Sequence, residues 1–200
     1  MDAEKNRRQT RRYNFSSPRA SNHQTSDARI GPPTRAPTSH ANSNTEWALY
    51  KVTQTIEIVA DPKLVWDALI DVSTSATWRN GNFKTIWSLG EHFEITATIG
   101  TKEFSSKGIV RVVDPPSVLE YAYWSPIQRL PDIPESYSTV RMTVDNRGKG
   151  TFLTVEHWVP PSPVMRGEGW EIGPESGQKH VEFYWRMTLP ILKRIVEHEG

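Results

Sequence analysis

His157 is the residue in this sequence with the clearest capacity for proton transfer. It alternates with Leu153 and Val155, so in a strand all three side chains lie on one face. An imidazole exchanges protons near neutral pH, and Tyr121 and Tyr123, which also alternate, could orient a substrate carbonyl or hydroxyl. No carboxylate or second base is recognisably paired with His157, and a single inward histidine is usually a hydrogen-bonded core residue. We therefore assign no catalytic residue and keep His157 as a weak candidate.

Motifs for other kinds of chemistry are not found. The chain has no cysteine, which excludes disulfides, cysteine zinc sites, thiolate iron–sulfur clusters and a cysteine nucleophile. Its six histidines show neither an HExxH motif nor any short ligand spacing, so we predict no metal site. There is no GxSxG elbow, Walker loop or GxGxxG after a strand, and Gly148-Lys149-Gly150 is better interpreted as a hairpin turn. We expect no cofactor.

The first elements that must position these side chains are one strand and two short helices. The β-branched segment 52–59 predicts the strand. Asp61 as N-cap and Pro62 at the first helical position predict a helix directly after it. A second short helical segment should end near Trp78, before the turn signal Asn80-Gly81.

A run of strands is expected next. Apolar side chains recur at every second position over five segments, the pattern of a sheet with one wet face. These segments are 93–99, 104–113, 119–123, 140–144 and 153–157. Lys107, Arg111 and Arg141 alternate away from the apolar face and should be solvated. The order predicts an antiparallel meander.

The period changes from about Gly177 onward, which predicts a long C-terminal helix. Its apolar residues recur at three- and four-residue spacing and form one stripe. They are Val181, Tyr184, Trp185, Thr188, Leu189, Leu192, Ile195 and Val196. Pro190 lies inside this pattern and should kink the helix. A helix laid across the concave side of a curved sheet would hide both apolar faces, which predicts an α+β fold.

The side chains expected on the concave face are mostly large and apolar, with a few polar tips. Such a set suits a cavity for a small hydrophobic or aromatic molecule, but it suits a packed core equally well. The candidate ligand-binding residues are Trp78, Phe93, Ile95, Tyr121, Tyr123, Met142, Leu153, Val155, His157, Trp185 and Leu189. Loops around Trp78, 126–134 and Trp170 are expected to close the cavity.

Composition divides the chain into two parts. Residues 1–45 contain no Leu, Val or Trp and carry eight basic against three acidic groups, so we predict a disordered basic tail rich in Ser, Asn and Pro. Residues 46–200 suit a single domain, which holds all eight tryptophans and is net acidic. An acidic folded part argues against nucleic-acid binding. The absence of a long apolar run or a secretory signal predicts a cytoplasmic protein without membrane contact.

The order of several short motifs resembles the START-like SRPBCC superfamily. Ile56-Glu57-Ile58 leads through Asp61-Pro62 to the segment 65–69, Gly108-Ile109-Val110 precedes Asp114-Pro115-Pro116, and Leu119-Glu120-Tyr121 follows. Further marks are the segment 131–135 before Ser138, Gly150-Thr151 before Leu153, and Trp185 in the last helix. The match, over roughly residues 50–197, is closest to the branch similar to the C-terminal domain of activators of the 90-kDa heat-shock chaperone ATPase.

That resemblance implies a helix-grip fold, often with an internal cavity for hydrophobic ligands. Members of the superfamily include ligand carriers, cyclases and co-chaperone domains, so the fold does not select one activity. We favour binding of a small hydrophobic ligand without catalysis. A co-chaperone-like module that contacts a protein partner is the alternative, and a cyclase or hydrolase using His157 is a third hypothesis. The Gly- and Pro-rich segment 160–177 is longer than the family pattern and lies where the cavity mouth is expected.

Overall fold

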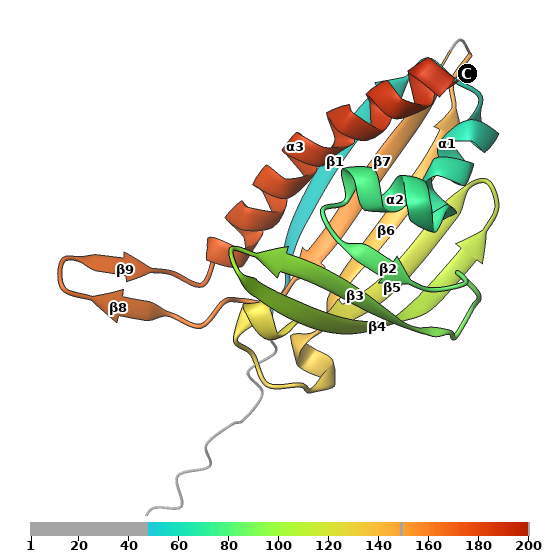
Figure 1. The fold of residues 1–200 in the computed structure, drawn as a ribbon. Coiled ribbons are helices and arrows are strands. Elements are labelled where there is room, and N and C mark those ends of the chain that lie inside the picture. The colour runs from blue at the N-terminus through green and yellow to red at the C-terminus, as the bar shows by residue number, and fades with distance from the viewer. Residues whose placement is uncertain (1–47, 149, 200) are drawn as a thin grey trace, which may run out of the picture. The chain divides into compact units, whose positions relative to one another are not determined.

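The computed structural model describes residues 48–148 and 150–199. The predicted basic tail, residues 1–45, lies outside the described residues, as does the start of the predicted domain at residue 46. Within the described part, one antiparallel sheet is covered on its concave side by a long helix and two short ones (Figure 1). This is the predicted helix-grip arrangement. No helix in residues 48–148 and 150–199 is long and apolar enough to cross a membrane.

The main sheet has seven strands in the order β1-β7-β6-β5-β4-β3-β2, all antiparallel. Its strands are β1 (Tyr50–Ile58), β2 (Asn82–Lys84), β3 (His92–Ile99), β4 (Lys102–Asp114), β5 (Val118–Trp124), β6 (Ser138–Asn146) and β7 (Thr151–Val159). Strands β2 to β7 follow one another in space as they do in sequence, which confirms the predicted meander, and β1 pairs with β7 to complete the sheet.

The solvated face is confirmed. Arg141 on β6 pairs with Glu120 on β5 at 2.8 Å, and Lys107 pairs with Asp132 across the outer surface. The glycine Gly108 on β4 faces inward, and a Cβ atom there would lie 2.3 Å from the Phe93 ring and 2.5 Å from the Ala122 carbonyl oxygen. The absence of a side chain at Gly108 lets the Phe93 ring lie directly against β4.

The two short helices are α1 (Pro62–Ile70) and α2 (Val72–Trp78), and each begins directly after an aspartate N-cap. The Asp61 carboxylate accepts a hydrogen bond from the Lys63 backbone N–H at 2.7 Å, as an N-cap should. Asp71 ends α1 and caps α2, accepting from the Thr74 backbone N–H at 2.7 Å. The sequence predictions for both helices are confirmed.

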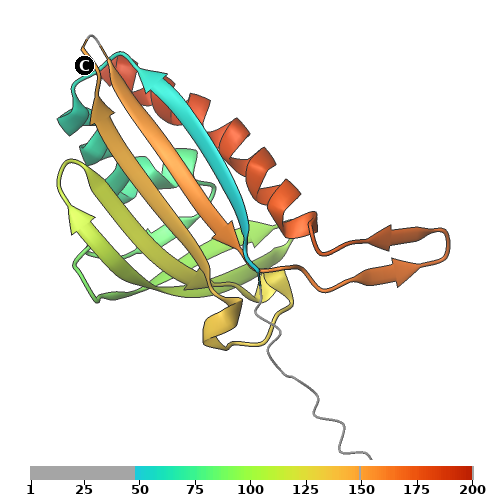
Figure 2. The ribbon, with the colours of Figure 1, turned by 180° about the vertical axis from the view of Figure 1, so that it is seen from behind.

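Helix α3 (Ser176–Glu199) crosses the concave face of the sheet (Figures 1 and 2). Six residues of its predicted stripe are buried and two, Tyr184 and Ile195, are partly buried; the buried ones are Val181, Trp185, Thr188, Leu189, Leu192 and Val196. Pro190 lies within the helix and does not end it. Pro190 and Arg186, four residues earlier, are both exposed, so the carbonyl that loses its helical partner lies on the solvent side.

The segments between these elements differ from the simple pattern. Two single-turn 3₁₀ helices, η1 (Pro126–Gln128) and η2 (Pro134–Ser136), occupy the predicted loop between β5 and β6. The Gly- and Pro-rich segment before α3 forms a hairpin of β8 (Met165–Gly167) and β9 (Trp170–Ile172), which projects away from the sheet and α3 (Figures 1 and 2). A hydrogen bond from the Ser162 N–H to the Pro174 carbonyl closes its base at 2.9 Å.

Candidate functional site

A cavity of about 500 Å³ lies between the N-terminal half of α3 and the sheet. Its walls come from β2 to β7, from the residues directly after α2, from η1, from α3 and from the β8–β9 hairpin with the segment that leads into it. The buried part is lined by Ser106, Tyr121, Ser125, Val140, His157 and Trp185. The exposed lining residues, which mark the mouth, include Ile99, Ile127, Arg129 and Ile172.

The eleven predicted ligand-binding residues divide into two groups. Five of them line the cavity: Ile95, Tyr121, Tyr123, His157 and Trp185. The other six lie in the packed core and do not line it: Trp78, Phe93, Met142, Leu153, Val155 and Leu189. Period-two alternation places a side chain on a face, but it does not say which stretch of that face a helix covers.

The filled end of the concave face is the end covered by α1. Strand β7 begins there, where the Thr151 hydroxyl donates to the Ala60 carbonyl just before α1 at 2.6 Å. Leu153 and Val155 follow closely in β7 and are fully packed, whereas His157, near the far end of the strand, reaches the cavity. The packed core and the cavity, which the sequence left as alternatives, therefore occupy different ends of the same face.

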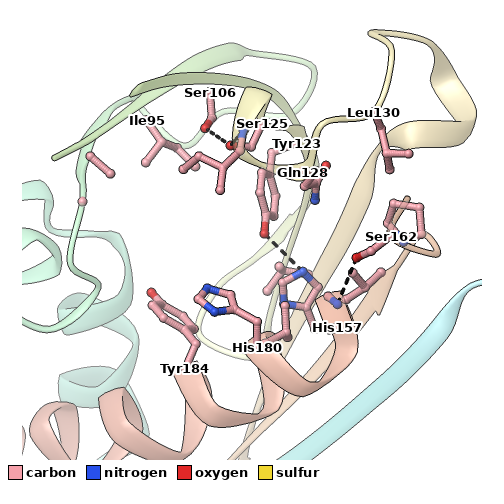
Figure 3. Close-up of a pocket in the computed structure, with 18 of the residues that line it drawn as sticks. Ile95, Ser106, Tyr123, Ser125, Gln128, Leu130, His157, Ser162, His180 and Tyr184 are labelled. Atoms are coloured by element: carbon pink, nitrogen blue, oxygen red, sulfur yellow. Dashed lines mark hydrogen bonds between the residues drawn. The ribbon is translucent and has the colours of Figure 1, made fainter. Parts of the chain in front are cut away.

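His157 is buried and both of its ring nitrogens are engaged. Trp185 Nε1 donates to Nδ1 at 3.0 Å, and Nε2 lies 3.4 Å from Tyr123 Oη (Figure 3). Because an indole N–H can only donate, Nδ1 must be the acceptor, and the neutral tautomer carries its hydrogen on Nε2. Burial lowers the pKa of His157 to about 3. The imidazole is thus held neutral, with no free nitrogen to take a proton from a substrate.

The phenols of the cavity are also held neutral. Burial raises the pKa of Tyr123 and of Tyr184. Tyr184 extends from α3 and donates to the Arg79 carbonyl at 2.8 Å, which ties the long helix to the end of α2. His180, one turn earlier, also rises from α3 toward the cavity (Figure 3). The phenols of Tyr123 and Tyr184 can hydrogen-bond a bound molecule without becoming charged.

Three polar residues that the sequence analysis did not single out stand on the opposite wall (Figure 3). Ser106 on β4 donates to Ser125 at 2.9 Å, and both hydroxyls are buried. Gln128 of η1 donates to Ser138 at 2.8 Å, while its Oε1 is buried without a partner. Ser106 could have been found, because Lys107 was placed on the wet face and its neighbour must point inward.

Arg79, directly after α2, is the least expected residue of the site. It lines the cavity and is only 3% exposed. Its guanidinium carbon lies 4.6 Å from the Trp78 ring centroid, 4.9 Å from that of Phe83, 5.4 Å from that of Trp87 and 6.0 Å from that of Tyr121. No periodic pattern marks an arginine at the end of a seven-residue helix, so Arg79 could not be recognised from the sequence.

The hydrogen bonds of Arg79 are incomplete. Nη2 donates to the Leu69 carbonyl at 3.0 Å, whereas Nε and Nη1 are buried and have no partner among the residues that the structure describes. Burial lowers the pKa of Arg79, and the surrounding ring faces offset part of the cost of burying the cation. Within residues 48–148 and 150–199, no group of three or more histidine or carboxylate side chains is placed to hold a metal ion.

Comparisons with known proteins agree with this architecture. A family model described as Activator of Hsp90 ATPase homolog 1-like protein matches residues 59–197. Among curated proteins, no sequence matches this chain. The solution structure of ChR145 from Cytophaga hutchinsonii superposes with a TM-score of 0.59 at 23% identity, over 75% of this chain and 95% of that one.

Two further solved structures share the fold. DynU16, described as a protein in the dynemicin biosynthetic locus, gives a TM-score of 0.56 at 20% identity, over 74% of this chain and 47% of that chain. The Aha1 dimer from Colwellia psychrerythraea gives 0.51 at 15% identity, over 74% of this chain and 96% of that chain. Likeness at these identities shows the fold alone.

Proposed function

The chain belongs to the family of Activator of Hsp90 ATPase homolog 1-like proteins, and within that family we propose that its domain binds a small hydrophobic or aromatic molecule in the cavity between the sheet and α3. The observation that carries the proposal is the cavity itself. Its volume of about 500 Å³ falls in the range of small-molecule sites, and side chains of all strands from β2 to β7 and of α3 converge on it. Rings and aliphatic groups form most of the wall, with hydroxyl, amide and imidazole groups at a few points.

Binding without catalysis fits the chemistry of the polar groups. His157 has both nitrogens engaged and a pKa far below neutrality, so it is a poor general base. Tyr123 and Tyr184 are held as neutral phenols by burial. These groups can orient a ligand by hydrogen bonds, and neither His157 nor the two phenols is set up to move a proton near neutral pH.

A fluorescence titration with N-phenyl-1-naphthylamine tests the proposal, because this neutral aromatic probe brightens in apolar cavities. Ile95 lines the cavity and is only partly buried, so Ile95→Trp fills the space without enlarging the packed core. Ala97→Phe, on the same strand, fills it independently. Ile86, which is 74% exposed and away from the cavity, provides the matched control Ile86→Trp.

We expect saturable uptake by the wild type and by Ile86→Trp, and loss of uptake by Ile95→Trp and Ala97→Phe. Thermal unfolding of each variant shows whether the fold is intact. Uptake that survives both filling substitutions in folded protein, or no uptake by the wild type, would overturn the proposal.

A protein-interaction role is the second candidate, because the family is described by its action on a chaperone ATPase. An apolar surface outside the cavity supports it: Val164 and Trp170 of the hairpin region are 49% and 52% exposed, and neither lines the cavity. If this surface contacts a chaperone of the 90-kDa class, Trp170→Ser lowers stimulation of the chaperone's ATPase and Ile95→Trp does not. Equal stimulation by wild type and Trp170→Ser would remove this surface from consideration.

A further inference from the structure

The cavity is lined by cationic and neutral groups only. Among the residues that form its wall there is no Asp or Glu, whereas Arg79 and Arg129 both belong to it. Nine ion pairs occur in the described part of the chain, and neither arginine takes part in any of them. Two unpaired cations in a space without carboxylates create a positive potential that favours an anionic occupant.

Arg129 is the cation at the mouth. It is exposed and ends η1 with φ 57° and ψ 25°, a left-handed conformation that non-glycine residues adopt rarely. One of its terminal nitrogens, Nη1, lies 2.7 Å from the sulfur of Met165, which also lines the cavity. Its other guanidinium N–H groups have no hydrogen-bond partner in the described part of the chain and present a planar fork suited to a carboxylate or sulfonate.

Arg79 is the cation deeper in the structure. It is more than nine-tenths buried, lies on the cavity wall, and has Nε and Nη1 without partners. Its charge is not neutralised by any carboxylate of the cavity wall, so its field acts on whatever fills the cavity. The first turn of α3 also borders the cavity through Ser176 and Gly177, so the positive end of the helix dipole adds to the same potential; Glu175, directly before the helix, is paired with Lys179.

We propose that the molecule bound in this cavity is an aromatic anion, with its ring system between the sheet and α3 and its anionic group bound by Arg129 at the mouth. This inference rests on the proposed function and narrows it to one ligand class. The orientation follows from the free energy of desolvation. Burial stabilises an apolar ring, whereas a charged group is more stable where both water and a cation contact it. Arg79 provides attraction from the interior, and Arg129 makes the direct contact.

A matched pair of probes tests the charge separately from the cavity. N-phenyl-1-naphthylamine is neutral, and 1-anilinonaphthalene-8-sulfonate has the same ring system with one sulfonate added. We expect the wild type to bind the anionic probe at least about tenfold more tightly, the effect of one good charge-assisted contact. Arg129→Met should remove that preference and change the affinity for the neutral probe by less than about twofold. Added salt should weaken the anionic probe selectively.

Arg166→Met is the control, because Arg166 lies in the neighbouring hairpin and is already paired with Glu171 at 2.6 Å. The Arg166→Met variant should prefer the anionic probe by the same factor as the wild type does. Two results would overturn the anion proposal: equal affinities of the wild type for the two probes, or an unchanged preference for the anionic probe in Arg129→Met. In either case, uptake of the neutral probe would still support the proposed function. If the wild type does not bind the neutral probe, and Ile95→Trp binds the anionic probe as tightly as the wild type does, both proposals fail.

Discussion

At the scale of single residues, His157 connects the cavity to the stability of the fold. Its imidazole is held neutral by burial and accepts a hydrogen bond from Trp185 at 3.0 Å. If Nδ1 were protonated, its N–H would face the indole N–H of Trp185, and no carboxylate lines the cavity to stabilise the added positive charge. The structure therefore assigns His157 a positioning role: it fixes Trp185 and Tyr123 at the back of the cavity.

This environment predicts acid sensitivity with a definite sign. The pKa of His157 falls from an ordinary 6.5 to about 3 on folding, so below pH 6.5 the unfolded chain binds a proton that the folded protein does not. The neutral imidazole's contribution to the free energy of unfolding is complete above pH 6.5 and is lost as the pH falls toward 3. At pH 5 the free energy of unfolding should be lower by about 2 kcal/mol. Urea unfolding at pH 7 and pH 5 measures it.

The variants for this experiment are His157→Gln and His180→Gln. His157→Gln should not show this decrease in the free energy of unfolding and should keep only the pH dependence that comes from the remaining groups. His180→Gln should behave as the wild type does, because the His180 side chain is exposed. The same pH dependence in His157→Gln and in the wild type would show that the buried imidazole is not the source.

Arg79 should be more useful for binding than for stability. A buried cation without a carboxylate partner is expensive to desolvate, and an apolar side chain of similar length can replace it at little or no cost. We expect Arg79→Met to keep the wild-type melting temperature or exceed it, while its affinity for the anionic probe falls. A clear drop in melting temperature by calorimetry would instead make Arg79 a stabilising residue of the aromatic cluster.

The candidate site could be predicted only in part at this scale. Ile95, Tyr121, Tyr123, His157 and Trp185 were found because alternation and helical spacing fix the face on which a side chain lies. Arg79 and Arg129 could not be found in that way. Each follows a short helical turn, where no period exists, and the burial of Arg79 depends on four rings that lie between the adjacent Trp78 and the remote Tyr121.

At the scale of elements, the packing of β3 on β4 depends on one missing side chain. Gly108 pairs with Phe93 in the antiparallel register, and the Phe93 ring covers it. A Cβ atom at Gly108 would lie 2.5 Å from the Ala122 carbonyl oxygen, a backbone atom that cannot rotate away. We expect Gly108→Ala to lower the free energy of unfolding by about 1–3 kcal/mol, the usual cost of overpacking.

Gly81→Ala is the matched control for that change. Its added Cβ would meet the Ile95 side chain at 3.2 Å and the Thr96 carbonyl oxygen at 3.5 Å, contacts that small shifts relieve. Chemical denaturation of both variants gives the comparison. If the two substitutions cost the same, the close approach of β4 and β5 is not what requires a glycine at Gly108.

Longer elements were predictable and very short ones were not. Strands of seven or more residues and the 24-residue helix α3 show enough repeats for a period to emerge. Strands β2, β8 and β9 have three residues each, so they show no recognisable alternation. The β8–β9 hairpin was therefore anticipated only as a Gly- and Pro-rich segment, although it carries Met165, which contacts Arg129 at the cavity mouth.

At the scale of the folded domain, the concave face of one sheet serves two purposes. Helices α1 and α2 and the C-terminal part of α3 pack one end into a core of fully buried side chains. The N-terminal part of α3 stands over the other end and leaves the cavity. Because the packed end holds the sheet together without the cavity, we expect cavity-filling variants at the open end to remain folded.

Native mass spectrometry of the wild type and Ile95→Trp, each titrated with N-phenyl-1-naphthylamine, tests the central claim most directly, because it counts bound molecules. A single bound probe per wild-type chain and none on folded Ile95→Trp is the result that the cavity predicts. A wild type that stays free of probe, or a variant that binds it equally well, would contradict the claim that this domain binds a small molecule between its sheet and α3.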